Sequence, residues 1–209
     1  MVTAASRRSH GLLLSRGPAV TVTSWARRGV VPVRVHELEP WVAVVPDGPS
    51  AARPPYDESL RVLAARPVAS RMRPSVGCFV IDRAAVVTVH PPGWRPVQRW
   101  VLWHPDHGVA RVPDLPLARP GDIARAVGAP ARTTEGVVRD ALRTPAPDAL
   151  TLLEGLMEVL RLPGFRLLAA ARGAAAVGTL VEPEPRHVDR FERTVHHEAF
   201  MRAELEDRL

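Results

Sequence analysis

The sequence predicts an α+β fold, with an antiparallel, β-rich domain over residues 17–130 and a helical subdomain over residues 131–209 that packs on it. Short runs rich in β-branched residues, closed by Pro, Gly and Asp turns, fill the β-rich part. From residue 131 the composition changes to Leu, Ala, Glu and Arg, which favours helices. Residues 1–16 are small, polar and basic without sustained periodicity, so we expect a flexible tail there.

The β-rich domain contains an internal echo that predicts a duplicated unit of strands followed by a short helix. A Trp-Val pair opens an apolar run at Trp41 and again at Trp100, and both runs end in Pro-Asp followed by Gly. Val-Thr-Val precedes each run, at positions 20–22 and 87–89. We therefore expect Trp41 and Trp100 to occupy equivalent places in two related sheet segments.

The elements of the first unit follow from local patterns. Residues 20–35 are expected to form two strands joined around positions 25–29, because valines alternate with polar residues there. The run 41–45 is apolar at nearly every position, as in a strand buried on both faces. Asp57 is expected to cap a short helix that ends before Pro67.

The second unit contains the clearest hairpin. Residues 77–81 and 85–89 form strand patterns on either side of Asp82-Arg83. A further hairpin is expected from residues 97–103 and 109–112, turning at Pro105-Asp106-His107-Gly108. After a proline-rich link, Asp122 is expected to cap a helix that ends near Gly128.

The C-terminal subdomain is expected to hold short helices at 133–142 and 148–162, a small hairpin or edge pair from 165–168 and 178–181, and a long terminal helix from about Pro185. One stripe of the terminal helix is apolar. Its members are Val188, Phe191, Val195, Ala199, Leu205 and Leu209. Such a stripe docks on the body of the same chain or on a partner, and we favour the body.

Composition restricts the function classes. The net charge is +6 and all 28 basic residues are arginines, a pattern typical of a high-GC bacterial genome, so the basic balance is weak support for nucleic-acid binding. Residues 1–75 hold 11 arginines against 5 acidic residues, whereas residues 144–209 hold 8 against 11. The single Cys78 excludes an internal disulfide and a cysteine-based zinc site. No segment approaches membrane-spanning length, so we expect a cytoplasmic protein without a membrane partner.

All five tryptophans fall in the β-rich region beside arginines. Aromatic rings next to Arg form stacking platforms for single-stranded nucleic acid and hot spots of protein interfaces. Trp25 and Trp94 are expected to be exposed in turns, and one of Trp100 and Trp103 is expected to face outward. The predicted binding surface consists of Trp25, Arg27, Arg28, Trp94, Arg95, Arg99 and Trp103.

A second candidate is His104-Pro105-Asp106-His107, whose imidazoles and carboxylate are metal-ligand types. The first copy of the echo has no histidine at this place, which favours a turn with surface histidines. The histidines of the terminal helix are expected on a solvated face, and Cys78 as a small buried hydrophobe. No phosphate loop, nucleophile elbow or dinucleotide turn is present in the sequence.

The sequence favours a non-enzymatic interaction or adaptor protein that uses the Trp/Arg surface, the terminal helix, or both. Nucleic-acid binding through the arginines of residues 1–75 is the first alternative. A metal-dependent hydrolase around His104, Asp106 and His107 is the second. A protein partner is expected, and no cofactor is expected.

Overall fold

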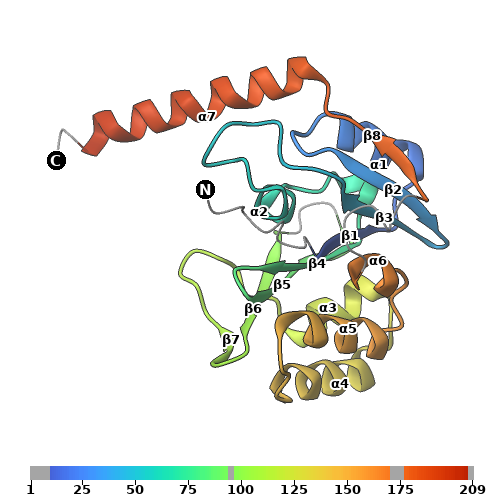
Figure 1. The fold of residues 1–209 in the computed structure, drawn as a ribbon. Coiled ribbons are helices and arrows are strands. Elements are labelled where there is room, and N and C mark those ends of the chain that lie inside the picture. Colours follow the sequence, from blue (N-terminus) through green and yellow to red (C-terminus); the bar gives the residue numbers. More distant parts are fainter. Residues whose placement is uncertain (1–9, 94–96, 170–176, 207–209) are drawn as a thin grey trace, which may run out of the picture.

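A computed structural model describes residues 10–93, 97–169 and 177–206 (Figure 1). Its strands are β1 (Gly11–Ser15), β2 (Val33–Leu38), β3 (Trp41–Pro46), β4 (Ser75–Ile81), β5 (Ala84–His90), β6 (Arg99–His104), β7 (Gly108–Ala110) and β8 (Thr179–Val181). Within the described residues they form one antiparallel, 8-stranded sheet in the order β7-β6-β5-β4-β1-β3-β2-β8. The predicted α+β class is confirmed.

Helices lie on both faces of this sheet. They are α1 (Ala19–Arg27), α2 (Ser59–Ala65), α3 (Pro120–Val127), α4 (Ala131–Arg143), α5 (Ala149–Val159), α6 (Phe165–Ala169) and α7 (Pro185–Glu206), with a short 3₁₀ turn at Ser70–Met72. One apolar core lies between the sheet and α3 to α6, and a second between the opposite face and α1 and α2 (Figure 1). The helical C-terminal part therefore packs mainly on one face.

Strand β1 corrects the prediction of a flexible tail over residues 1–16 for its last part, and residues 1–9 lie outside the described residues. Residues 11–15 form a central strand between β3 and β4, and all five are buried. Leu12 and Leu14 enter the core beneath α3 to α6, and Leu13 enters the opposite core. A strand covered on both faces is apolar throughout and shows no alternation, so this short run carried no strand periodicity.

Helix α1 corrects the prediction of a strand over the first valines. Val22, Trp25 and Ala26 have helical spacing and share the buried face of α1. Their burial outweighs the β propensity of the neighbouring Val and Thr residues, because propensity is a weak preference that packing overrides. The second predicted strand is present as β2.

The internal duplication is not shown. Positions 20–22 lie in α1, whereas positions 87–89 lie in β5. Trp41 packs in the core beneath α3 to α6, whereas Trp100 packs against the opposite core. Since side chains alternate along a strand, it is Trp103 that shares the core of Trp41. The expected equivalence of Trp41 and Trp100 is wrong.

The predicted hairpins are confirmed. Strands β4 and β5 turn at Asp82-Arg83, whose positive φ angles of 49° and 68° match a two-residue hairpin turn. Strands β6 and β7 form the second hairpin, although β7 is only 3 residues long. Helices near 57–67 and 122–128 are present as α2 and α3, with Gly128 at φ 73° closing α3. The expected caps are wrong: the N-cap residues are Glu58 and Arg119, and Asp122 lies in the first turn of α3, where its carboxylate accepts from Arg119 N.

The C-terminal elements agree in part with those expected from the sequence. Helices α4 and α5 are found as expected. Residues 165–169 form helix α6, so no hairpin joins them to β8, which instead pairs with β2 at the sheet edge. Within the described residues, no helix has the length and apolar character needed to cross a membrane.

Helix α7 begins at Pro185 and extends away from the body (Figure 1). The amide of Glu184 donates to the carbonyl of Arg27 at 2.9 Å, which fixes its start. Val188 and Phe191 pack against the core beneath α1 and α2. Docking on the same chain is therefore found, but only for the first two turns of the helix.

Candidate interaction surfaces

The residues of the predicted Trp/Arg surface do not form one surface, and two of its tryptophans are buried. Trp25 is 9% exposed, donates from Nε1 to the carbonyl of Pro67 at 3.0 Å, and has the Arg66 guanidinium 3.8 Å from its ring centroid. Trp103 is 3% exposed. The expected exposure of Trp25 is wrong, because it lies on the buried face of α1, and Trp103 belongs to the core. Both indoles stabilise the fold.

The arginines of the predicted surface are dispersed. Arg27 and Arg28 are exposed at the end of α1, where Arg28 donates to Ser24 Oγ at 2.9 Å. Arg99 lies at the start of β6, on the other half of the sheet. Trp94 and Arg95 lie outside the described residues. The structure therefore does not bring Arg27 and Arg28 together with Arg99.

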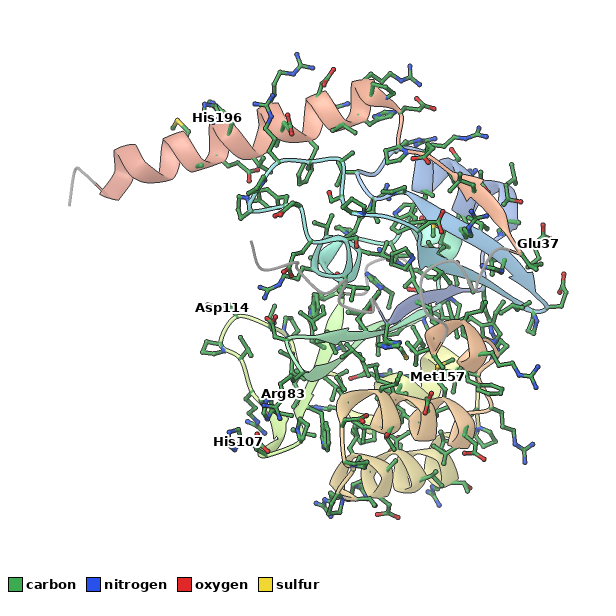
Figure 2. The ribbon with its side chains drawn as sticks, in the orientation of Figure 1. Glu37, Arg83, His107, Asp114, Met157 and His196 are labelled. Atoms are coloured by element: carbon green, nitrogen blue, oxygen red, sulfur yellow. The ribbon has the colours of Figure 1, made fainter. Side chains whose placement is uncertain are left out.

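A pocket does form around Trp100, at the β6–β7 end of the sheet. The segment after β7 folds back along β6: Trp100 N donates to the carbonyl of Pro116 at 2.8 Å, and Ala118 N donates to the carbonyl of Trp100 at 2.7 Å. The resulting cavity has a volume of about 390 Å³. This β6–β7 pocket is lined by Arg99, Trp100, Leu102, Ala110, Arg111, Val112, Leu115, Leu117 and Arg119. Figure 2 shows Asp114 on the same segment.

Three arginines give the β6–β7 pocket a positive charge. Arg99 Nε lies 3.6 Å from the carboxylate of Asp122, which also pairs with Arg125. Within the part of the chain that the structure describes, the side chains of Arg111 and Arg119 form no ion pair. Two guanidinium groups are therefore available to a carboxylate outside the chain.

Two exposed aliphatic side chains line the same pocket. Val112 is 41% exposed and Leu115 is 37% exposed. Trp100 and Leu102 are partly buried beside them. Aromatic, aliphatic and Arg side chains gathered at one place are typical of the centre of a protein interface.

Of this pocket, the predicted site contained only Arg99. Arg111 and Arg119 flank a proline-rich segment that the sequence pattern indicates only as a link between elements. Its contact with β6 joins Trp100 to Leu117 across 17 positions, and local patterns do not reveal such a pairing. The exposed Val112, which follows β7, is a local signal for this edge.

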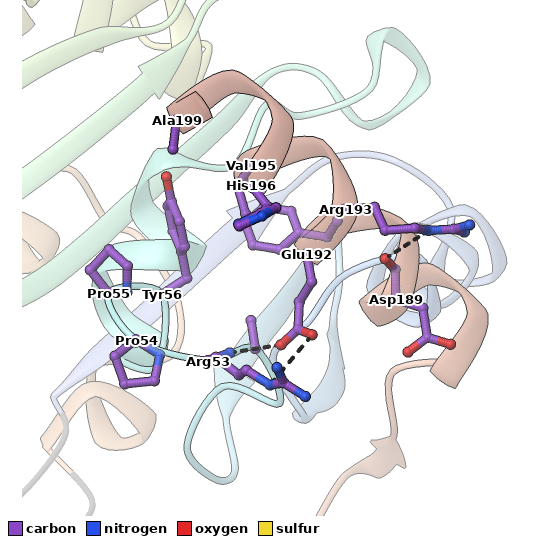
Figure 3. Close-up of a pocket in the computed structure, with 12 residues that line it drawn as sticks. Arg53, Pro54, Pro55, Tyr56, Asp189, Glu192, Arg193, Val195, His196 and Ala199 are labelled. Carbon is purple, nitrogen blue, oxygen red and sulfur yellow. Dashed lines mark hydrogen bonds and ion pairs between the residues drawn. The ribbon is translucent and has the colours of Figure 1, made fainter. Parts of the chain in front are cut away.

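A second cavity, of about 600 Å³, lies between α7 and the loop at residues 52–56 (Figure 3). Tyr56 and Phe191 meet edge to face with ring centroids 5.2 Å apart. Glu192 Oε1 accepts a hydrogen bond from Arg53 N at 3.0 Å. Beyond these contacts the cavity is bordered by Pro54, Pro55, Val195, His196 and Ala199, and we call it the α7 groove.

The histidine cluster forms a turn. Asp106 N donates to His104 Nδ1 at 3.2 Å, and His107 N donates to the carbonyl of His104 at 3.2 Å. The two imidazoles stack with centroids 5.3 Å apart. Among the described residues, no group of three or more His, Cys, Asp or Glu side chains is placed to hold a metal ion. These contacts support the turn interpretation of the motif.

Ser75 and His90 form a buried hydrogen-bonded pair that the sequence patterns do not predict. His90 Nε2 accepts from Val68 N at 3.4 Å, so Nδ1 carries the proton and donates to Ser75 Oγ at 3.1 Å. Ser75 and His90 are 0% and 2% exposed, so no substrate reaches them and the pair is structural. The register of a hairpin centred on Asp82-Arg83 pairs these two residues, which is the signal that would have found them.

Cys78 is the small buried hydrophobe that the sequence suggested. It pairs with Val87 in the ladder, and burial raises the pKa of its thiol to about 12. His90 lies further along β5, and His36 lies on β2, beyond β1 and β3. Neither histidine is placed to activate this thiol.

We expect protein stability to depend on pH through His90. Burial, and secondarily the charge of Arg73, lowers the pKa of His90 to about 4. An unfolded histidine titrates near 6.5, so below that pH the unfolded state binds more protons and stability falls until about pH 4. The loss is about 3 kcal/mol in order of magnitude. Urea unfolding at pH 7 and pH 4.5 measures it, and His90→Gln should show a smaller loss between these pH values than the parent protein.

Comparison with protein-family models, with curated proteins and with solved structures found no match.

Proposed function

We propose that this chain is a protein-binding protein that holds an acidic, partly apolar segment of a partner in the β6–β7 pocket. One observation supports the proposal most strongly: Arg111 and Arg119, without ion pairs in the described part of the chain, line a pocket together with Trp100 and the exposed Val112 and Leu115. Guanidinium groups bind carboxylates through two parallel hydrogen bonds, and the apolar side chains bury area.

The position of the pocket supports an extended segment as the ligand. Strand β7 is the last strand of the sheet order, so one of its edges has no neighbouring strand among the described residues. An extended peptide adds to such an edge through backbone hydrogen bonds, and its alternate side chains then reach the face of the sheet. A carboxylate on that face would meet the arginines of the pocket.

Nucleic-acid binding through residues 1–75 is less well supported, because most arginines described there have partners within the chain. Arg34 pairs with Asp47 at 3.0 Å, Arg61 pairs with Glu58 and Asp82, and Arg66 lies over Trp25. Arg16 donates to the carbonyl of Val127 at 2.9 Å. These side chains are dispersed and do not form one basic face.

A panel of labelled probes tests the proposed function. The full chain is titrated into fluorescent peptides that share an apolar sequence and carry Glu, Gln or Arg at the same positions, and into a single-stranded oligonucleotide. We expect the Glu peptide to bind best, with an affinity that falls as salt rises. Equal binding of the Glu and Gln peptides would contradict the proposal. Tighter binding of the oligonucleotide would replace it with the nucleic-acid alternative.

A further inference from the structure

Helix α7 is attached to the body only near its start. Its contacts there include the packing of Val188 and Phe191 on the core beneath α1 and α2, the Glu184–Arg27 backbone bond, the Tyr56–Phe191 ring pair and the bond from Arg53 N to Glu192. From His196 the described side chains are exposed, and the helix continues to Glu206 away from the body (Figure 1). A polar, isolated helix of this length is only marginally stable in water, so packing on another surface would stabilise it.

The α7 groove lies where the anchored part of the helix meets this free part. Figure 3 shows Tyr56, Pro54 and Pro55 on one side and Val195, His196 and Ala199 on the other. Val195 continues the apolar stripe of Val188 and Phe191, and Ala199 is a small residue one turn later. A small side chain at this point lets a second helix approach closely.

The charges along α7 are complementary to those of a second α7 that runs in the opposite direction. Residues 185–196 hold three arginines against two acidic residues, and residues 197–206 hold three glutamates against one arginine. Two such helices placed antiparallel bring the basic half of each against the acidic half of the other. Parallel placement would bring like charges together.

We infer that α7 pairs antiparallel with the α7 of a second copy of this chain, and that this helix fills the α7 groove. The pairing is two-fold symmetric, so each copy supplies the same groove and the same free helix end. The two-fold axis of the dimer passes close to His196 and Ala199. Residues 195–206 of each α7 then cover the groove of the other copy. This segment is about 18 Å long at 1.5 Å per residue. The resulting dimer leaves the β6–β7 pocket free on each copy.

Sedimentation of the full chain over a range of concentrations tests this inference. We expect a concentration-dependent dimer. Val195→Glu with Ala199→Glu should weaken it about tenfold or more, because a charge then occupies the helix contact. Val20→Glu is the matched control, since Val20 is 76% exposed on α1 and its replacement should leave the dimer unchanged. Circular dichroism confirms that the variants remain folded.

Charge exchange tests whether the charges of α7 hold the two copies together. Arg190→Glu with Arg193→Glu, and separately Glu204→Arg with Glu206→Arg, should each abolish self-association, because both halves of α7 then carry the same sign. An equimolar mixture of the two variants should restore a heterodimer, since the signs become complementary again. A parent protein that stays monomeric at high concentration would overturn the inference. So would a dimer that all of these substitutions leave intact.

Discussion

Replacing Phe79 with Ala is expected to lower the free energy of unfolding by about 3–5 kcal/mol, a large part of the stability of a domain. Phe79 is fully buried on β4, beneath α1 and α2. Its ring covers two glycines, since a Cβ at Gly77 would lie 2.5 Å from the ring and one at Gly11 would lie 2.8 Å from it. Removing the ring leaves a cavity that the central strands cannot close.

A double-mutant cycle measures the energetic coupling between the Phe79 ring and Gly77. Gly77→Ala alone should destabilise the protein, because its methyl group meets both Thr88 Oγ1 and the Phe79 ring, and the part of that cost due to the ring should disappear in the Phe79→Ala background. Urea unfolding measures all four variants. Val20→Ala is the surface control, with an expected change within about 0.5 kcal/mol. Additive costs at Gly77 and Phe79 would contradict the close packing described here.

Reversing the charge of Arg111 and Arg119 in the β6–β7 pocket is expected to reduce binding of the acidic probe peptide by about 100-fold or more. A hydrogen bond to a charged group contributes about 1.5–3 kcal/mol, and each Arg→Glu change replaces one with repulsion. The variant is Arg111→Glu with Arg119→Glu, measured by fluorescence anisotropy. Its control is Arg27→Glu with Arg28→Glu, which changes the net charge equally on the distant α1.

The control distinguishes a site from a general charge effect. If both double variants weaken binding to the same degree, the peptide responds to the net charge of +6 and not to the pocket. If neither weakens it, the arginines of the pocket are not in contact with the peptide. Unchanged thermal unfolding of both variants shows that the fold is preserved.

Local chemistry explains which elements the sequence predicts. The β4–β5 hairpin follows from two strand patterns around Asp82-Arg83, and the end of α3 follows from Gly128 in a left-handed conformation. Helix α5 is capped by Asp148, whose carboxylate accepts from Thr151 N at 2.8 Å. Each of these signals lies within a few residues of the element that it defines.

Elements that depend on contacts between residues far apart in the sequence are not predicted by such local patterns. Strand β1 is central because β3 and β4 flank it, and Trp25 is buried because α1 packs on the sheet. The sequence predicts that Trp25 and Trp103 lie on the surface, because arginines are their neighbours in the sequence. Both indoles are buried, because their large apolar area favours packing in the core. The β6–β7 pocket needs the return of residues 111–118 to β6, which no local pattern indicates.

Hydrogen exchange of the full chain, with and without the acidic probe peptide, tests most directly where this protein binds a partner. We predict slower amide exchange confined to residues 99–119, which contain β6, β7 and the segment that folds back over Trp100. Protection of residues 53–56 and α7 instead, or no protection at saturating peptide, would contradict the assignment of partner binding to the β6–β7 pocket.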